Sequence, residues 1–243
     1  WKDVHLSGLR SLPIGETIEG GHEILPFENV AEVVDKFEYY TVSECPCKTR
    51  HNMDPSYKDS SKPTEVCLHF DDLGHYIVEN GMGREITKEE TLEILKKAAD
   101  AGLVHGLTNW MDKPDTICSC CPDYCMFFEA YHKLGHGKSL DPSNYLVKTA
   151  PDKCKACALC IKRCPMDAIQ LRVHAEAKNK FRKAISVDPD ACIGCGVCVH
   201  KCPTGSLVLV SRDQTTEPPK NAGEFIGIYM KDRFAAMQEG KQD

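Results

Sequence analysis

The chain has 243 residues, of which 42% are hydrophobic and 27% are charged, and this apolar content is too high for a chain that is disordered throughout. No run of sequence approaches the roughly 18 consecutive apolar residues of a membrane-spanning helix, so we expect a soluble protein without a membrane span. The net charge of −6 is unevenly divided, because residues 149–243 hold 15 Lys and Arg against 11 Asp and Glu, whereas residues 1–148 hold 15 against 25.

The cysteine content is unusual, with 15 cysteines in the chain. Their number is odd, and they occur in C-x-C, C-x-C-C and C-x-x-C spacings with no secretory signal segment, which indicates metal or cluster ligation and not a disulfide framework. We therefore expect a cytoplasmic, reducing location. Because residue 1 is Trp, we also expect a processed form or a fragment, and what precedes Trp1 cannot be read here.

The first predicted elements are an arm and a helix. Residues 1–25 are Gly-rich and predict an extended arm or a short hairpin that needs a partner surface. Residues 27–40 carry apolar side chains at helical spacing and predict an amphipathic helix. Residues 48–66 are polar, contain two prolines, and predict a loop that leads to Cys67 and a helix over 67–81.

The clearest local signal lies in residues 86–105. Thr87 followed by Glu90 forms a capping box, and Gly102 supplies the stop of the predicted helix. A short strand is predicted over 103–107, followed by a second cysteine group and a helix from Asp123. We interpret residues 135–149, which contain Gly, Pro, Ser and Asn, as a linker.

The second part of the chain repeats itself. The run CKACALCIKRCP at 154–165 recurs as CIGCGVCVHKCP at 192–203, and each copy is followed by a helix-to-strand phrase, which indicates an internal duplication. In a C-x2-C-x2-C-x3-C-P run, three thiolates on one tight loop bind one cluster and the fourth points to the other cluster. This rule predicts two 4Fe-4S clusters, one held by Cys154, Cys157, Cys160 and Cys202 and one held by Cys192, Cys195, Cys198 and Cys164. Zinc held by the same cysteines is the alternative.

On these motifs, residues 150–212 resemble a bacterial-type ferredoxin domain with two 4Fe-4S clusters. The resemblance implies a pseudo-twofold pair of short helices and hairpins that moves single electrons at low potential. Free ferredoxins of this type are generally acidic, but this region is net positive. We expect the stretch between the motifs to be a hairpin insert, either a basic docking or cluster-facing edge or a solvated loop; its basic residues are His174, Lys178, Lys180, Arg182 and Lys183.

Seven further cysteines lie in the first half: Cys45, Cys47, Cys67, Cys118, Cys120, Cys121 and Cys125. Their C-x-C pairs are too tight for zinc-finger knuckles, and soft sulfur ligands favour iron–sulfur or zinc over harder metals. We predict a third iron–sulfur cluster on Cys47, Cys67, Cys118 and Cys121, with Cys45, Cys120 and Cys125 as alternative ligands. The alternatives are structural zinc, a second metal, a larger non-cubane cluster, reactive thiols or simple core packing.

Other motifs are absent from the sequence. The histidines are scattered without a His-x-x-His or Glu-x-x-His pattern, and no G-x-S-x-G, P-loop or G-x-G-x-x-G run occurs. We therefore predict no catalytic residue, and no cofactor beyond the clusters. The acidic charge around residues 93–105 opposes phosphate binding, so we expect no nucleic-acid partner.

Together these patterns predict an α+β fold in three parts. We expect an α-rich, cysteine-containing domain with an additional metal cluster over 1–148, a ferredoxin-like, βαβ-duplicated, two-cluster domain over 149–216, and a tail with one helix over 217–243. Taken whole, the chain resembles ferredoxin-fused, cysteine-rich proteins of anaerobic microbes, in which a C-x-C, a lone Cys and a C-x-C-C precede a ferredoxin module.

The predicted function is electron transfer. Single electrons would pass through two or three 4Fe-4S clusters to redox partner proteins, with the chain a subunit of a larger oxidoreductase complex in anaerobic metabolism and not a catalyst by itself. Two alternatives stay open: an iron–sulfur enzyme with an open-site cluster in the first half, and a redox-sensing iron–sulfur regulator.

Overall fold

The computed structural model describes residues 4–19, 25–56 and 61–239, and it mixes helices and strands in the predicted α+β class. Residues 1–3 and 20–24 of the expected arm, and 57–60 of the expected loop, lie outside these ranges.

The first half is built on a six-stranded antiparallel sheet. Its strands lie in the order β1, β5, β6, β3, β2, β4, and their bounds are β1 Leu9–Leu12, β2 Tyr40–Glu44, β3 Glu65–Phe70, β4 Gly83–Ile86, β5 Val104–Thr108 and β6 Thr116–Cys120. The sequence patterns indicated helices in this half but not the sheet against which they pack. Apart from β5, these strands escaped the sequence patterns because they are four to six residues long and because one sheet face carries cysteine and hydroxyl side chains in place of large apolar ones.

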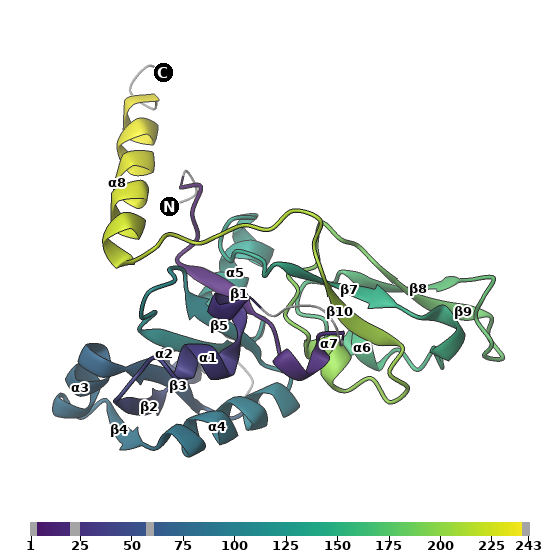
Figure 1. Ribbon diagram of the computed structural model, residues 1–243, viewed down its shortest axis with the longest axis horizontal. Coiled ribbons are helices and arrows are strands. Elements are labelled where there is room, and N and C mark those ends of the chain that lie inside the picture. The colour runs from purple at the N-terminus through teal and green to yellow at the C-terminus, as the bar shows by residue number, and fades with distance from the viewer. Residues whose placement is uncertain (1–3, 20–24, 57–60, 240–243) are drawn as a thin grey trace.

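Helices cover both faces of this sheet (Figure 1). On one face, α1 (Val30–Val34) and α4 (Lys88–Asp100) contribute Val33, Val34 and Leu95 to a core shared with Leu68 and Ile117. The other elements here are the 3-10 helix η2 (Pro26–Glu28), α2 (Pro46–Asn52), α3 (Asp71–Glu79) and α5 (Met126–Leu134). Helix α3 begins only at Asp71, since residues 65–70 pair in the sheet, so the helix predicted over 67–81 is shorter than expected.

The capping signal of α4 is confirmed. The backbone N–H of Glu90 donates to Oγ1 of Thr87 at 3.2 Å, which satisfies one of the unpaired N–H groups of the first turn. Gly102 follows the helix with φ +85°, a conformation that favours glycine, and the predicted strand after it is β5.

The N-terminal arm finds its partner surface within this chain. Strand β1 pairs with β5, and the 3-10 helix η1 (Gly15–Thr17) follows it. The backbone N–H of Ile14 donates to the carbonyl of Cys195 at 3.3 Å, and that of Glu19 donates to the carbonyl of Leu209 at 2.8 Å. The arm therefore ties the sheet of the first half to the cysteine motifs of the second.

The duplicated region forms two small antiparallel sheets. Strand β7 (Tyr145–Thr149) pairs with β10 (Leu207–Ser211), and β8 (Ile169–Val173) pairs with β9 (Lys183–Val187). Its helices are η3 (Pro151–Lys153), α6 (Leu159–Arg163) and α7 (Val197–His200). The predicted hairpin insert is confirmed as β8–β9, and the last residues of the expected linker form β7.

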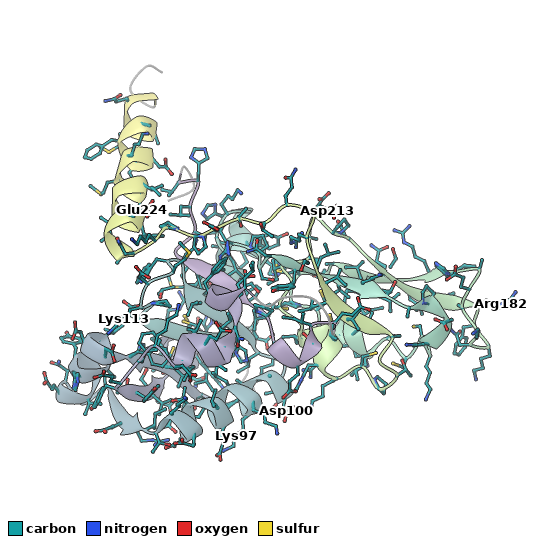
Figure 2. All side chains as sticks on the ribbon, in the orientation of Figure 1. Lys97, Asp100, Lys113, Arg182, Asp213 and Glu224 are labelled. Carbon is teal, nitrogen blue, oxygen red and sulfur yellow. The ribbon has the colours of Figure 1, made fainter. Side chains whose placement is uncertain are left out.

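Helix α4 ends against the duplicated region. The guanidinium of Arg163 donates to the carbonyls of Ala99 at 2.8 Å and Asp100 at 3.2 Å, and Nε2 of His200 lies 2.8 Å from Oδ1 of Asp100. Basic groups at the C-terminus of a helix interact favourably with the negative end of the helix dipole. Asp100, labelled in Figure 2, thus marks a direct contact between the two halves.

The predicted C-terminal helix is α8 (Ala222–Glu239), which stands away from the body in Figure 1. It is anchored at its base, where the rings of Trp110 and Phe225 lie 5.6 Å apart and the N–H of Met111 donates to the carbonyl of Pro219 at 2.9 Å. Within the described ranges, no helix has both the length and the apolar character needed to cross a membrane.

Candidate metal centres

The two cysteine motifs have similar backbone conformations. Equivalent positions of the repeat adopt a positive φ in both copies: Ala156, Ala158 and Asp167 in the first, and Gly194, Gly196 and Gly205 in the second. This left-handed conformation turns each loop sharply around the space between its cysteines. The N–H of Ala156 thereby comes within 3.4 Å of the Cys154 sulfur, the kind of donor that stabilises thiolates.

Two cavities lie inside these loops. The first is lined by three cysteines of the first motif and one of the second: Cys154, Cys157, Cys160 and Cys202. The second has the reverse composition: Cys192, Cys195, Cys198 and Cys164. Each cavity therefore has four soft sulfur donors, with Ile185 beside the first set and Val147 and Ile169 beside the second. These residues fit a thiolate-held iron–sulfur cluster.

The fourth ligand position of the first cavity has hydroxyl donors. Burial raises the pKa of the Cys202 thiol, but hydrogen bonds from Ser206 and Thr204 outweigh it and lower the pKa to about 7. The Oγ atom of Ser206 lies 3.4 Å from the sulfur and Oγ1 of Thr204 lies 3.7 Å from it. The thiols of Cys160 and Cys195 are buried without such side-chain donors, and burial raises their pKa to about 11 and about 12.

The comparison with known families agrees with this geometry. Residues 153–206 match the family model of the 4Fe-4S dicluster domain. All eight cysteines that line the two cavities lie within this dicluster domain. The match supports an iron–sulfur, ferredoxin-like domain and iron–sulfur electron transfer in general. No curated protein matches the chain.

The first half holds a separate group of sulfurs. Six of its seven cysteines are linked by sulfur–sulfur contacts into a closed ring, in the order Cys45, Cys67, Cys118, Cys120, Cys125, Cys47 and back to Cys45. We name these six residues the cysteine ring.

Sheet register and helix starts build the ring. Leu68 pairs with Ile117, which places Cys67 directly opposite Cys118 on the adjacent strands β3 and β6. Cys118 and Cys120 are two residues apart in β6 and so lie on one face of the sheet. The remaining members come from the starts of two helices, since Cys45 and Cys125 are the N-cap residues of α2 and α5 and Cys47 lies in the first turn of α2.

The ring holds sulfurs of two kinds, because the pKa is raised for the thiols of Cys45, Cys67, Cys120 and Cys125 and lowered for those of Cys47 and Cys118. Backbone N–H groups of Lys48, Met126 and Phe128 hydrogen-bond to the sulfurs of Cys45, Cys47 and Cys125, respectively. Contacts with Cys125 and Cys45 lower the pKa of Cys47, with a smaller contribution from the charge of Arg50. The sulfur contacts of Cys118 with Cys120 and Cys67 lower its pKa to about 6.

Of the four ligands that the sequence favours for a third cluster, Cys47, Cys67 and Cys118 belong to the ring. Cys121 does not, because it follows Cys120 directly at the end of β6 and its sulfur turns to Oδ2 of Asp123, 3.5 Å away. The three alternative ligands, Cys45, Cys120 and Cys125, all lie in the ring. The C-S-C spacing of residues 118–120 indicates that Cys118 and Cys120 share one face of a strand. This signal can be used only if residues 116–120 are first recognised as a strand.

Among the described residues, no group of three or more His, Cys, Asp or Glu side chains has the compact arrangement that holds a single metal ion. This is true of the eight dicluster cysteines as well. In an iron–sulfur cluster each thiolate binds an iron atom of its own, so the ligands stand around the cluster and not around one point.

The ring lies where two hydrophobic cores meet. Cys120 and Cys125 belong to a core that also contains the dicluster cysteines Cys160 and Cys198, whereas Cys45 belongs to the core of the six-stranded sheet and Cys47 packs against that core. Helix α5 connects the two kinds of site, since it begins after Cys125 and Nε2 of His132, near its end, donates to the carbonyl of Pro165 at 2.8 Å. Pro165 follows Cys164, which lines the second dicluster cavity.

Proposed function

We propose that this chain is an iron–sulfur electron-transfer protein in which two 4Fe-4S clusters carry single electrons to a partner oxidoreductase. One cluster is held by Cys154, Cys157, Cys160 and Cys202, and the other by Cys192, Cys195, Cys198 and Cys164. The observation that carries the proposal is the exchange of the fourth cysteine between the two cavities, which is the arrangement of two-cluster ferredoxins.

When bound, the clusters supply one-electron redox chemistry. The side chains and backbone groups around them determine the polarity of each cavity and the reduction potential of its cluster. Apolar side chains form part of each cavity wall, Ile185 in the first cavity and Val147 and Ile169 in the second. Hydrogen bonds from Ser206 and from backbone N–H groups stabilise negative charge on the ligand sulfurs, which raises the reduction potential. The charge of Arg163 acts on Cys198 and Cys195 in the same sense.

Electrons enter or leave at the first cavity. Cys157 is exposed, whereas the other cysteines of the dicluster domain are buried or half-buried. The β8–β9 hairpin lies beside this loop, because Nδ2 of Asn179 donates to the carbonyl of Cys154 at 2.9 Å. The basic residues of the hairpin support an acidic redox partner at this edge. Because Cys157 is exposed, oxygen has access to a ligand of the first cluster, and this supports a role in anaerobic metabolism.

Helix α8 supports the role of a subunit in a larger complex. Its large apolar side chains are exposed: Ile226, Ile228, Met230, Phe234 and Met237. The ring in the first half supports a further iron–sulfur centre in the relay, for which structural zinc is the alternative.

The proposal is tested on the full chain purified without oxygen. We expect about eight iron atoms and as much acid-labile sulfide from the dicluster domain alone, reduction by dithionite, and re-oxidation by a one-electron acceptor. Cys157→Ser should perturb the spectrum of one cluster and Cys195→Ser that of the other. A chain that holds zinc in place of iron, or whose reduced clusters pass no electrons to the acceptor, would contradict the proposal.

A further inference from the structure

We propose that a cavity between the two halves of the chain binds an uncharged ligand of the quinone type, a flat apolar molecule that carries carbonyl oxygens. The cavity has a volume of about 350 Å³ and is lined by residues of η1, α1, α4, β5 and α7, and we name it the η1–α4 cavity. It shares no lining residue with either dicluster cavity. The source of electrons for the ligand rests on the proposed function, whereas binding of the ligand does not.

The walls of the η1–α4 cavity are mainly apolar. Helix α4 contributes Leu92, Leu95 and Ala99, while Ile14 of the N-terminal arm and Val30 of α1 complete the apolar lining. The volume lies at the lower end of the range of about 300–1,000 Å³ that is typical of ligand pockets. The cavity therefore suits a small molecule with one or two fused rings.

The charges at the cavity favour an uncharged ligand. Its lining contains one acidic side chain, Glu16, and one lysine, Lys96, and both residues are exposed. An anion or a cation would meet one attractive and one repulsive charge here, so neither gains a clear electrostatic advantage.

A buried histidine supplies the polar group of the cavity. His105 is 3% exposed and lines the cavity, and its Nδ1 lies 3.3 Å from Oγ of Ser119. Burial lowers the pKa of His105 to about 4, so the imidazole is neutral at pH 7 and carries one N–H. Within the described ranges, the Ser119 hydroxyl has no other hydrogen-bond partner, so we assign it as the donor to Nδ1. The N–H of His105 is then at Nε2.

This N–H selects the chemistry of the ligand. Among the residues that the structure describes, no acceptor lies within hydrogen-bond distance of Nε2 of His105. A buried donor without an acceptor is costly, and a ligand that supplies the acceptor removes that cost. A carbonyl oxygen on an apolar ring satisfies both the N–H and the walls, whereas a pure hydrocarbon satisfies only the walls.

The η1–α4 cavity adjoins the second dicluster cavity, which favours a redox-active ligand. The N–H of Ile14 donates to the carbonyl of Cys195 at 3.3 Å, and His200, another lining residue, lies two positions after Cys198 in α7. Cys195 and Cys198 both line the second dicluster cavity. Reduction of a quinone to its hydroquinone takes two electrons and two protons. Each of the two reduced clusters supplies one electron and is oxidised, and water supplies the protons.

Binding is measured by equilibrium dialysis of the full, cluster-loaded chain in its oxidised form, without oxygen. The probe is 2,3-dimethyl-1,4-naphthoquinone, because its methyl groups block the ring carbons to which cysteine thiols would add. We expect one molecule bound per chain. The matched probe is 2,3-dimethylnaphthalene, which has the same fused rings without carbonyl oxygens. Absence of saturable quinone binding overturns the proposal.

The variant His105→Phe tests the hydrogen bond, because it keeps an aromatic ring and removes the N–H. It should weaken binding of the quinone by about 2- to 12-fold, the factor that corresponds to one hydrogen bond, and leave binding of the hydrocarbon unchanged. An equal change for the two probes, or no change for either, would contradict recognition of a carbonyl oxygen. Unchanged iron content shows that the variant folds.

The variant Leu92→Trp tests the location of the site. Leu92 is 38% exposed on α4 and lines the cavity, so a larger side chain can fill the cavity with little disturbance of the core. We expect it to abolish binding of both probes. Lys97→Trp, on the same helix but outside the cavity lining, is the matched control and should bind both probes like the wild-type protein. Full binding in Leu92→Trp would overturn the assignment to this cavity.

Electron transfer provides a second measurement. The rate at which the quinone re-oxidises the reduced clusters should level off at high quinone concentration in the wild-type protein and rise linearly in Leu92→Trp. A chain that passes electrons to a one-electron acceptor but does not bind the quinone would contradict this inference alone. A chain that binds the quinone, but whose clusters pass electrons to no acceptor, would count against the proposed function and leave the binding site in place.

Discussion

The sulfur of Cys202 and the hydroxyl oxygen of Ser206 lie 3.4 Å apart at the wall of the first dicluster cavity. The hydroxyl donates to the thiolate, and this bond stabilises the more negative, reduced state of a cluster at this ligand. A hydrogen bond with a net value of about 0.5–1.5 kcal/mol corresponds to at most roughly 20–60 mV for one electron. Ser206→Ala should lower the potential of the first cluster within this range, as measured by spectroscopic redox titration.

Ser186→Ala is the control for this prediction, because Ser186 is exposed on β9 and lines neither dicluster cavity. Its potentials should equal those of the wild-type protein. A Ser206→Ala chain with both potentials unchanged would show that the hydroxyl does not act on the cluster.

Gly194 and Ala156 occupy equivalent places in the two loops, with φ of +66° and +57°, but their surroundings differ. A Cβ at Gly194 would lie 2.2 Å from both Oγ of Ser143 and the carbonyl oxygen of Tyr145, and the latter is backbone that cannot turn aside. Gly194→Ala should therefore displace the second loop and lose about four iron atoms per chain. Ala156→Gly removes the strain of a left-handed alanine, so it should keep all its iron.

The measurement for this pair is iron content together with the melting temperature of the anaerobic protein. If Gly194→Ala binds as much iron as Ala156→Gly and melts at the same temperature, the loop accommodates the side chain and the packing argument fails.

The dicluster motif was readable from sequence because its ligands are local. Three cysteines of each set lie within seven residues, so their spacing alone describes the loop. The capping box at Thr87 and the stop at Gly102 are local in the same way. All of these features depend on residues that lie close together in the sequence, so the sequence alone predicts them.

The cysteine ring was not readable in this way, because it depends on pairing between strands far apart in sequence. Cys67 and Cys118 meet only through the register of β3 against β6. Strand β3 runs directly into the helix that follows it, and one face of β6 carries Thr116, Cys118 and Cys120 in place of large apolar side chains. The choice between Cys120 and Cys121 rests on which sheet face each one occupies, and sequence spacing does not decide that.

A buried ion pair holds the arm of the first half near the end of the dicluster domain. Nη1 of Arg10 lies 3.1 Å from Oε1 of Glu28, both side chains are buried, and Arg10 also donates to Oγ1 of Thr216 at 2.9 Å. Glu28→Ala would leave the guanidinium buried without its counter-charge, which typically costs about 3–5 kcal/mol. We expect a corresponding fall in the free energy of unfolding, measured with denaturant under anaerobic conditions.

An exposed ion pair provides the comparison. Oε2 of Glu93 lies 3.8 Å from Nζ of Lys97 on the surface of α4, and Glu93→Ala should cost less than about 1 kcal/mol. Similar losses in the two variants would mean that burial of the Arg10–Glu28 pair carries no special weight.

His105 makes the stability of the first half depend on pH. It is buried beside Ser119, with Nδ1 3.3 Å from the hydroxyl, and burial lowers its pKa to about 4. The unfolded chain, with a histidine pKa near 6.5, binds the proton more readily than the folded chain between the two values. Stability should therefore be complete above about pH 6.5 and decline toward pH 4, by a total on the order of 3 kcal/mol.

The check is the denaturation midpoint between pH 5 and 7.5 for the wild-type protein and for His105→Gln, which keeps a polar partner for Ser119. The variant should show a flatter profile. The control is His174→Gln, at an exposed position of the hairpin region, and it should follow the wild-type curve. Parallel profiles for all three proteins would rule out His105 as the source of the pH dependence.

The β8–β9 hairpin is the part of the dicluster domain that reaches farthest from the sheet of the first half, and Figure 2 shows Arg182 at its tip. Lys178, Lys180, Arg182 and Lys183 lie here, and Val173 and Phe181 are 77% and 55% exposed. A basic edge next to an exposed cluster ligand accelerates encounter with an acidic partner, and salt screens this attraction over about 10 Å at 0.1 M ionic strength. Electron transfer from an acidic two-cluster ferredoxin should therefore slow as salt is raised.

Charge reversal at the hairpin separates docking from redox chemistry. Lys180→Glu with Arg182→Glu should slow the second-order rate at low salt by roughly tenfold or more and flatten its salt dependence, because steering of this kind changes association rates by about 10- to 1,000-fold. The potentials of both clusters should stay unchanged, since neither side chain lines a dicluster cavity. Lys97→Glu with Lys96→Glu, on α4 of the acidic half, is the matched control and should leave the rate near its wild-type value. An equal effect of the two double variants would show that overall charge, and not this edge, guides the partner.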